Sequence, residues 1–169
     1  FDMSVTVTSP GRVNLIGEHT DYNGGWVLPA ALSVSLTATL MPRSDNRIGV
    51  SARGYSGNAE RSLVDAASGH WSDPAVGAVQ EAVKLGLLEG GADVSIQSTI
   101  PAGSGLSSSA ALIVTVLKAA REIANADLGD TDIAVAARRV ENEFMGVPCG
   151  IMDQMAVAIA KPGEAMALD

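Results

Sequence analysis

Residues 11–29 gather polar side chains of the types that recognise a hydroxylated ligand. Glu18, His19 and Asp21 place two carboxylates and an imidazole close together, and Arg12 precedes them on the same segment. Each hydroxyl of a sugar can both donate and accept a hydrogen bond, so a dense set of donors and acceptors is suited to reading a sugar. Turn-forming glycines flank the cluster, and a segment this polar is not expected to form a core strand.

A second segment, residues 101–111, reads Pro-Ala-Gly-Ser-Gly-Leu-Ser-Ser-Ser-Ala-Ala. Its glycines let backbone approach a ligand closely, and its serines lead into an apolar pattern of helical spacing. Free backbone N–H groups and the helix dipole attract an anion at such a helix start, and hydroxyls can bind phosphate or magnesium. The lysine of a common P-loop is absent. Taken alone, the segment fits a phosphate site and a serine-rich helix cap equally well.

The third segment of interest, residues 141–154, contains two carboxylates of different expected roles. Asp153 is expected in the first turn of a helix, where the dipole favours its ionised form. It could serve as a base or as the partner of an arginine, although spacing alone favours a plain helix-start aspartate. Glu141 follows Arg138 at i+3, which indicates a surface ion pair rather than a metal ligand. Cys149 is interpreted as a buried thiol without a nucleophilic role.

The composition predicts one globular domain and excludes several classes of protein. The chain has 169 residues, of which 47% are hydrophobic and 18% charged. The net charge of −8 argues against a nucleic-acid partner, although it does not exclude a small phosphate ligand. The single cysteine excludes an internal disulfide and fits a reducing, cytoplasmic location. No apolar run is long enough to suggest a membrane span.

Hydrophobic periodicity predicts the elements that must position these segments. Alternation over 33–40 and 48–52 predicts two strands joined as a hairpin by the turn at 42–46, and a further strand is expected near 94–98. Helices are expected from 73 to 90, from 106, from 131 to 146, and over 153–160, whereas 54–72 give no clear prediction. This mixture predicts an α+β fold. A new strand begins at 165–169, which suggests an interrupted domain.

Taken together, the three segments resemble the GHMP small-molecule kinases, and in particular the galactokinase family. Residues 11–23, Gly-Arg-Val-Asn-Leu-Ile-Gly-Glu-His-Thr-Asp-Tyr-Asn, are close to the galactokinase signature, and 149–154, Cys-Gly-Ile-Met-Asp-Gln, are again galactokinase-like. The serine loop resembles a motif of the whole superfamily. The resemblance implies that residues 1–169 form the N-terminal lobe, similar to domain 2 of ribosomal protein S5, with a mixed or antiparallel sheet and helices on one side. The C-terminal GHMP domain is expected to be absent.

The resemblance also implies an activity, namely ATP-dependent phosphorylation of galactose at its C1 hydroxyl, giving galactose 1-phosphate in the Leloir pathway. It implies a galactose-binding segment at 11–29, an ATP phosphate loop at 101–111 and a catalytic segment at 141–154. The implied roles are catalysis by Asp153 and Arg12, sugar binding by Glu18, His19, Asp21 and Gly150, phosphate binding by Gly103, Ser104, Gly105, Leu106, Ser107, Ser108 and Ser109, and Mg²⁺ binding by Ser109 and Glu141.

Two departures from the family pattern keep alternatives open. Trp71 and Gly77 keep the spacing of a family motif, but Pro74 stands where its tyrosine would be, which puts the nucleotide-base contacts in question. The third glycine-rich motif is missing. The alternatives are a non-catalytic sugar and nucleotide binder or sensor, and a GHMP kinase for another sugar such as N-acetylgalactosamine. The intact serine loop favours catalysis, because sensor relatives are altered there.

We further expect that the chain alone has little kinase activity and exposes an apolar face. Its partners would then be galactose, ATP and either the missing C-terminal half or a second copy bound through that face. No nucleic-acid or membrane partner is expected.

Overall fold

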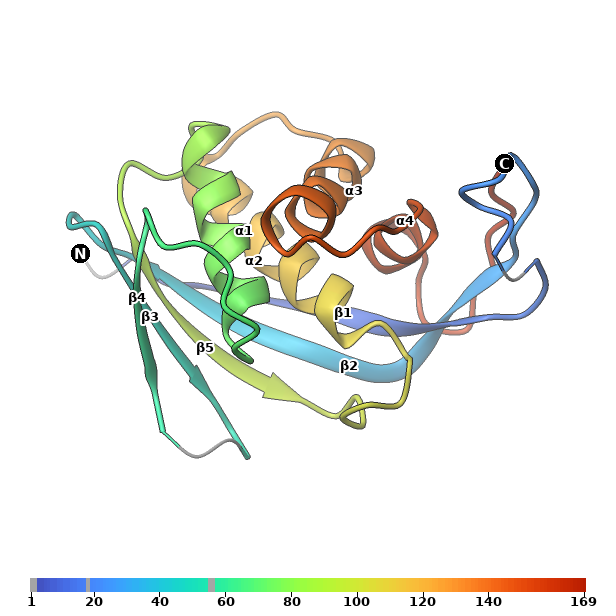
Figure 1. Cartoon of the computed structure of the whole chain (residues 1–169), viewed down its shortest axis with the longest axis horizontal. Helices are drawn as coiled ribbons and strands as arrows, with labels where there is room; N and C mark the ends of the chain where they lie inside the picture. Colours follow the sequence, from blue (N-terminus) through green and yellow to red (C-terminus); the bar gives the residue numbers. More distant parts are fainter. Residues whose placement is uncertain (1–2, 18, 55–56) are drawn as a thin grey trace.

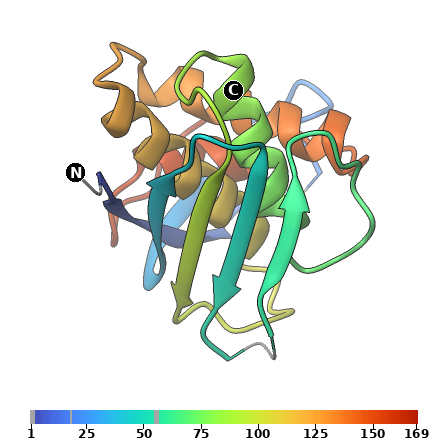
Figure 2. The same ribbon diagram turned by 90° about the vertical axis from the view of Figure 1, so that its left-hand side faces the viewer.

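A mixed five-stranded sheet with helices on one face forms the fold (Figure 1). The computed structural model describes residues 3–17, 19–54 and 57–169. The strands are β1 (Val5–Asn14), β2 (Pro29–Pro42), β3 (Arg47–Ala52), β4 (Ala59–Ser62) and β5 (Ala92–Ser98), in the order β1-β2-β5-β3-β4. Figure 2 shows the helices stacked behind the strands. The predicted α+β class, with a mixed sheet covered on one side, is confirmed.

The predicted hairpin between the second and third strands is wrong, because β5 lies between them. β5 pairs antiparallel with β2 and parallel with β3. The turn after β2 bends around the start of β5: the Arg43 amide donates to the Gly91 carbonyl at 2.8 Å, and the Gly91 amide donates to the Asp45 carbonyl at 2.7 Å. A Cβ at position 91 would collide with the Arg47 carbonyl. Glycine at position 91 therefore allows β5 to lie between β2 and β3.

The helices are α1 (Asp73–Lys84), α2 (Ser108–Ala124), α3 (Asp130–Arg139), the π-helix η1 (Val140–Phe144) and α4 (Met152–Ile159). α2 packs against β1 and β2, and its Ile113 and Leu117 side chains are completely buried in the core between the helices and the sheet. Burial of such side chains is the main favourable contribution to folding. None of the helices in the described residues is long and apolar enough to cross a membrane.

Two of the helices differ from the predicted ones, one in its end and one in its pitch. α1 stops at Lys84 rather than near 90, because Gly86 adopts φ +72° and the Leu87 amide donates to the Ala82 carbonyl at 2.9 Å, which closes the helix. The helix predicted from 131 to 146 changes pitch at Val140, whose carbonyl accepts from the Met145 amide at 2.9 Å. The unassigned stretch 54–72 contains β4.

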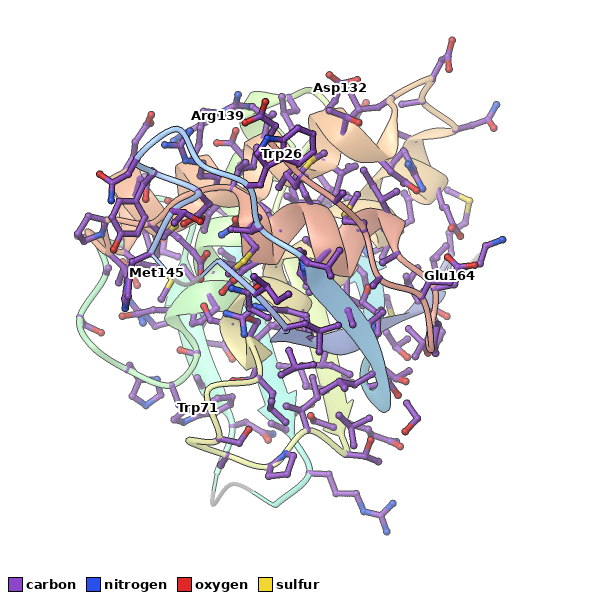
Figure 3. All side chains as sticks on the ribbon, turned by 90° about the vertical axis from the view of Figure 1, so that its right-hand side faces the viewer. Trp26, Trp71, Asp132, Arg139, Met145 and Glu164 are labelled. Carbon is purple, nitrogen blue, oxygen red and sulfur yellow. The ribbon has the colours of Figure 1, made fainter. Side chains whose placement is uncertain are left out.

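The uncovered face of the sheet is polar rather than apolar. Thr6 pairs with Thr39, and Thr8 with Thr37, through hydroxyl hydrogen bonds of 2.8 Å each across β1 and β2. Large apolar side chains are exposed instead on the connection between β1 and β2. Among them, Leu15, Ile16 and Trp26 have exposed fractions of 55%, 69% and 64%. Figure 3 looks onto this end of the molecule and labels Trp26.

The end of the chain returns to this same connection. The Val27 and Leu168 backbones exchange hydrogen bonds of 2.9 and 3.0 Å, and an isolated bridge joins Ala30 to Ala165. Figure 1 shows the two segments side by side. The C-terminal end of the chain is thus brought close to the end of β1 that carries Arg12, whereas the N-terminal end lies at the opposite end of that strand.

Candidate functional site

Arg12 and Asp153 form an ion pair although 141 positions separate them. Nε and Nη2 of Arg12 both lie 2.6 Å from Oδ1 of Asp153, and Nη1 donates to the Gly105 carbonyl at 3.1 Å. The exposed fractions of the two side chains are 15% and 30%, so the pair is partly shielded from water. Arg12 lies on β1, which includes residues 11–14. The expectation that the polar segment 11–29 forms no core strand is therefore wrong for its first residues. Asp153 lies in the first turn of α4, as predicted.

Ser107 occupies the other oxygen of the same carboxylate. Its hydroxyl donates to Oδ2 of Asp153 at 2.6 Å. Ser107 has φ +60° and directly precedes α2, and a side chain in this left-handed region costs free energy unless other contacts hold it there. The strained residue therefore brings the start of α2 against the start of α4. This contact has no signal in the sequence spacing.

The remaining residues of the serine loop form the turn that precedes α2. Gly103 and Gly105 adopt φ +68° and +70°, a region that glycine enters without strain. The Ser104 hydroxyl donates to the Pro101 carbonyl at 2.7 Å. Ser104, Gly105 and Leu106 line the main cleft, Ser108 is exposed in the first turn of α2, and the Ser109 hydroxyl lies 4.0 Å from Sδ of Met145.

The connection between β1 and β2 supplies polar groups to the cleft. His19 has φ +62°, and its Nδ1 shares a 2.6 Å hydrogen bond with the Tyr22 hydroxyl, which fixes the ring. The Asn23 side chain donates to the His19 carbonyl at 2.8 Å. Asp21 accepts from the Met152 amide at 3.4 Å through Oδ2. Glu18 lies outside the described residues.

Gly150 packs directly beneath the Asp21 carboxylate. A Cβ at position 150 would collide with that carboxylate, and Gly150 is itself buried. Only glycine at this position allows the carboxylate to lie against the backbone. The two predicted sugar-binding residues are thus brought together from opposite ends of the chain.

Glu141 is buried rather than paired on the surface, so the predicted ion pair with Arg138 is wrong. The residue is 8% exposed, and its Oε2 accepts a hydrogen bond from the Gln154 side chain. Arg138 instead donates to the Cys149 carbonyl at 3.2 Å. Burial raises the pKa of Glu141, an effect that hydrogen bonds from Ser109 and Gln154 oppose only in part. The i+3 interpretation assumed a surface helix, whereas this face is covered by the segment before α4.

The Cys149 thiol lies beside this carboxylate and is not activated. It donates weakly to Oδ1 of Asn142 at 3.2 Å, and burial together with the Glu141 charge raises the pKa of Cys149 to about 11. The thiolate is the reactive form of cysteine, so this thiol is expected to be inert at neutral pH. The structure agrees with the interpretation of Cys149 as a non-nucleophilic residue.

These groups surround one cleft of about 1260 Å³. Its lining residues come from the end of β1, the connection that follows it, the serine loop, α3, η1, the connection between η1 and α4, and the start of α4. They are Arg12, Val13, Asn14, His19, Asp21, Tyr22, Ser104, Gly105, Leu106, Arg138, Asn142, Gly146, Pro148, Cys149, Gly150, Met152 and Asp153. The size suits a small-molecule ligand. The cleft is one site built from all three segments that the sequence singled out.

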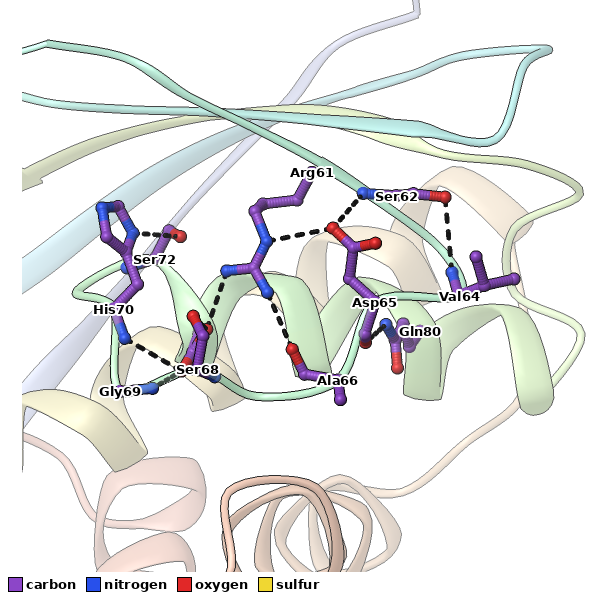
Figure 4. A network of polar contacts seen from close by, with 11 residues as sticks. Arg61, Ser62, Val64, Asp65, Ala66, Ser68, Gly69, His70, Ser72 and Gln80 are labelled. Atoms are coloured by element: carbon purple, nitrogen blue, oxygen red, sulfur yellow. Dashed lines mark hydrogen bonds and ion pairs between the residues drawn. The ribbon is translucent and has the colours of Figure 1, made fainter.

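A second, smaller hollow of about 430 Å³ lies beside the connection between β4 and α1. Its wall includes Arg61, His70 and Trp71, and a polar network holds the connection in place (Figure 4). His70 shares a 2.8 Å hydrogen bond with the Ser72 hydroxyl. Pro74 lies in the first turn of α1, where proline is favoured.

Comparison with known proteins identifies the family and the fold of the chain. A sequence model of the GHMP kinases N terminal domain matches residues 69–161, and the galactokinase galactose-binding signature matches residues 1–42. The chain is similar to Lactococcus lactis galactokinase, crystallised in complex with galactose, with 31% identity and a TM-score of 0.89. The match covers 98% of this chain and 44% of that one.

A second similar structure is the mevalonate kinase of Methanococcus jannaschii. It has 22% identity and a TM-score of 0.79, over 92% of this chain and 51% of that one, and it supports the fold alone. The chain thus spans about half the length of the solved structures that it matches. With a match over more than half of its residues, the chain belongs to the GHMP kinase family, whose N-terminal domain it contains.

Proposed function

We propose that the chain acts in ATP-dependent phosphorylation of galactose at the C1 hydroxyl, which yields galactose 1-phosphate. The observation that carries this proposal is the position of Asp153, held between Arg12 and Ser107 on the wall of a cleft that Asp21 and Gly150 also line. The galactose-binding signature over residues 1–42 and the galactose complex of the Lactococcus lactis enzyme support the choice of sugar.

Glu18, His19, Asp21 and Gly150 are the proposed sugar-binding residues. A fixed imidazole and a fixed carboxylate can discriminate between sugar epimers, because a wrongly placed hydroxyl would leave a buried polar group without its partner. The Tyr22 contact to His19 and the Gly150 contact to Asp21 support such fixed positions.

Asp153 and Arg12 are the proposed catalytic residues. In the transfer, the C1 oxygen forms a bond to the γ-phosphorus, the bond from that phosphorus to the ADP oxygen breaks, and the hydroxyl proton passes to Asp153. The hydrogen bonds from the Arg12 guanidinium and the Ser107 hydroxyl hold the Asp153 carboxylate in a fixed orientation. This suits phosphoryl transfer, in which positioning and charge neutralisation matter more than strong proton abstraction. The planar guanidinium of Arg12 suits the oxygens of the transferring phosphoryl group.

Residues 103–109 are proposed to hold the ATP phosphates, with Ser109 and Glu141 holding Mg²⁺. The two side chains offer a hydroxyl and a carboxylate, the hard oxygen donors that Mg²⁺ prefers. Within the described residues no ion pair neutralises the buried Glu141, and Oε1 of Gln154 beside it is buried without a hydrogen-bond partner. A cation here fits both observations. When bound, Mg²⁺ neutralises phosphate charge.

The described part of the chain contains no group of three or more His, Cys, Asp and Glu side chains that could hold a metal by themselves. Phosphate oxygens and water would therefore complete the Mg²⁺ shell, as is usual for this ion. The three segments 11–29, 101–111 and 141–154 are proposed to act as the galactose, phosphate and catalytic parts of one domain. A cytoplasmic location stays a prediction.

The decisive experiment combines calorimetric binding with detection of the product. Galactose, glucose and N-acetylgalactosamine are each titrated into the chain, and sugar 1-phosphate is then followed by ³¹P NMR with Mg²⁺ and ATP. We expect galactose to bind and to be phosphorylated slowly, because the chain spans 44% of the length of the similar galactokinase. Absence of galactose binding would contradict the proposal. Binding without transfer would favour a sugar-binding role, and preference for N-acetylgalactosamine would favour another sugar kinase.

A further inference from the structure

Asn142, on η1 at the wall of the cleft, holds the backbone that supports Asp21. Its Oδ1 accepts from the Cys149 amide at 3.0 Å, and its Nδ2 donates to the Cys149 carbonyl at 3.5 Å. One carboxamide therefore contacts both the backbone amide and the backbone carbonyl of Cys149, the residue directly before Gly150. Arg138 adds a second donor to the same carbonyl at 3.2 Å.

The position of Asp21 depends on this stretch of backbone. Gly150 lies directly beneath its carboxylate, where a Cβ would collide with it, and the Met152 amide donates to Oδ2 at 3.4 Å. A shift of the backbone at 149–152 would therefore move the surface on which the carboxylate rests. Within the described residues Asp21 and Asn142 share no hydrogen bond, so Asn142 acts on Asp21 through the backbone of residues 149–152.

The π-helix explains how two neighbouring residues reach the same segment. In η1 the Met145 amide donates to the Val140 carbonyl, and the Val147 amide donates to the Glu141 carbonyl at 2.8 Å. Both hydrogen bonds span more residues than the α-helical pattern, and such widened turns are frequent at functional sites. Glu141 contacts Gln154, whereas Asn142 contacts Cys149. The phosphate side and the sugar side of the cleft are thus supported from adjacent positions.

We propose that Asn142 is a positioning residue for sugar recognition, which presets Asp21 by holding the Cys149 backbone from both sides. The role of Asp21 as a sugar ligand rests on the proposed function, but the hold on residues 149–152 does not. If the Asp21 carboxylate is already held in place, the backbone beneath it need not be ordered when the sugar binds, and this improves affinity.

The test compares three variants of the full chain. Asn142→Leu has nearly the same shape and removes both backbone hydrogen bonds to Cys149, together with the weak one from the Cys149 thiol. Asn142→Asp keeps an acceptor for the Cys149 amide and loses the donor. Glu143→Gln changes the exposed neighbour in η1 and serves as the matched control. Amide hydrogen exchange is measured residue by residue, and the dissociation constants for galactose and ATP are measured by calorimetry.

In Asn142→Leu we expect exchange at Cys149 and Met152 to accelerate about tenfold, exchange in α2 to stay unchanged, and the galactose dissociation constant to rise about tenfold. The ATP dissociation constant should not change. Asn142→Asp should keep protection at Cys149, and Glu143→Gln should resemble the wild type. A role confined to general stability would instead accelerate exchange throughout and weaken both ligands.

Unchanged exchange at Cys149 and Met152 in Asn142→Leu would overturn the proposal whether or not galactose binds. Accelerated exchange with unchanged galactose affinity would overturn the link to sugar recognition. If Asn142→Leu unfolds, Asn142→Asp decides, because loss of protection at Cys149 despite its acceptor contradicts the proposed hold. A wild-type chain that binds no galactose contradicts the proposed function, and the exchange data still decide whether Asn142 holds the segment.

Discussion

Ser107 donates its hydroxyl to Oδ2 of Asp153 at 2.6 Å while its own backbone adopts φ +60°. The other oxygen of that carboxylate accepts from Arg12. Two strong donors thus fix the plane of the Asp153 carboxylate, one from each side, before any substrate is present. The strain at Ser107 is stored where the carboxylate must be aimed, which is typical of functional sites.

Substitution at Ser107 separates backbone strain from the hydroxyl contact. Ser107→Ala keeps the strain and loses the hydrogen bond, whereas Ser107→Gly loses both. We expect transfer to fall about tenfold in both variants, because the Asp153 carboxylate is no longer fixed on one side. Ser107→Gly should be about 1 kcal/mol more stable than Ser107→Ala, because glycine adopts positive φ without strain. Urea unfolding and initial-rate assays provide the two measurements, and equal stability of the variants would show that Ser107 is unstrained.

Asp153→Ala should abolish phosphoryl transfer while galactose binding survives. Within the described residues its carboxylate hydrogen-bonds to Arg12 and Ser107 and to none of His19, Asp21 and Gly150, so we expect the galactose dissociation constant to change by less than about threefold. Product formation by ³¹P NMR and calorimetry are the measurements. Asp127→Asn, at an exposed position in the connection before α3, is the control and should behave as the wild type. Normal turnover by Asp153→Ala would rule out the catalytic role.

Glu141→Gln should stabilise the ligand-free fold at neutral pH and abolish Mg²⁺-dependent transfer. Burial raises the pKa of Glu141 above its ordinary value of 4.5. Below that value both folded and unfolded chains hold the proton, and above the raised pKa the folded chain carries the full cost of a buried charge. Stability relative to the glutamine variant therefore falls as pH rises between the two values.

Melting temperatures at pH 4.5 and 7.5 test this expectation about Glu141. The advantage of the variant should widen by about a few degrees at the higher pH. Added Mg²⁺ and ATP should raise the melting temperature of the wild type more than that of the variant. An advantage that shrinks as pH rises contradicts the assigned origin of the shift.

Asp73 is expected to be the main polar anchor of the connection between β4 and α1. It is buried and accepts from the Arg61 guanidinium at 2.9 Å and from the Ser68 and Gly69 amides at 2.8 and 2.7 Å. Burial alone would raise the pKa of Asp73, but these donors outweigh it, so the pKa lies below 3.8. The resulting stability is present above pH 3.8 and is lost as pH falls through the lowered pKa.

Asp73→Asn should therefore cost about 3 kcal/mol at pH 7, since it leaves Arg61 without its buried partner. The difference from the wild type should diminish in acid. Urea unfolding at several pH values measures both effects. Asp65→Asn, which removes a more exposed carboxylate from the same arginine, is the control and should cost much less. Equal losses at the two positions would contradict the role of burial.

The individual elements could be predicted from the sequence better than their pairing. Alternating apolar residues such as Leu36, Ala38 and Leu40 mark a strand buried on one face, and the structure confirms this. The pattern holds no information about which strand lies alongside. Insertion of β5 depends on a backbone contact at Gly91, and a glycine in a sequence indicates only that some close approach or turn is possible.

The candidate site shows the same boundary between local and long-range information. The helix-start position of Asp153 was predictable, but only the family resemblance placed it in one catalytic site with Arg12, 141 positions away. Glu141 illustrates the opposite failure, because a valid local rule for helix surfaces was applied to a residue in a π-helix that is covered by another segment. Local spacing does not encode which face of a helix is later covered.

The pairing of Arg12 with Asp153 also has a kinetic consequence. The first strand and the last helix must meet before the cleft exists, and contacts of such long sequence separation are slow to form because a large loop must close first. Chains that have folded only as far as α3 hold Arg12 without its partner and cannot yet bind the ligands of the completed cleft. Ligand binding should therefore detect only molecules that have completed the last stage of folding. Bound ligand should stabilise against unfolding only those molecules in which β1 and α4 have already come together.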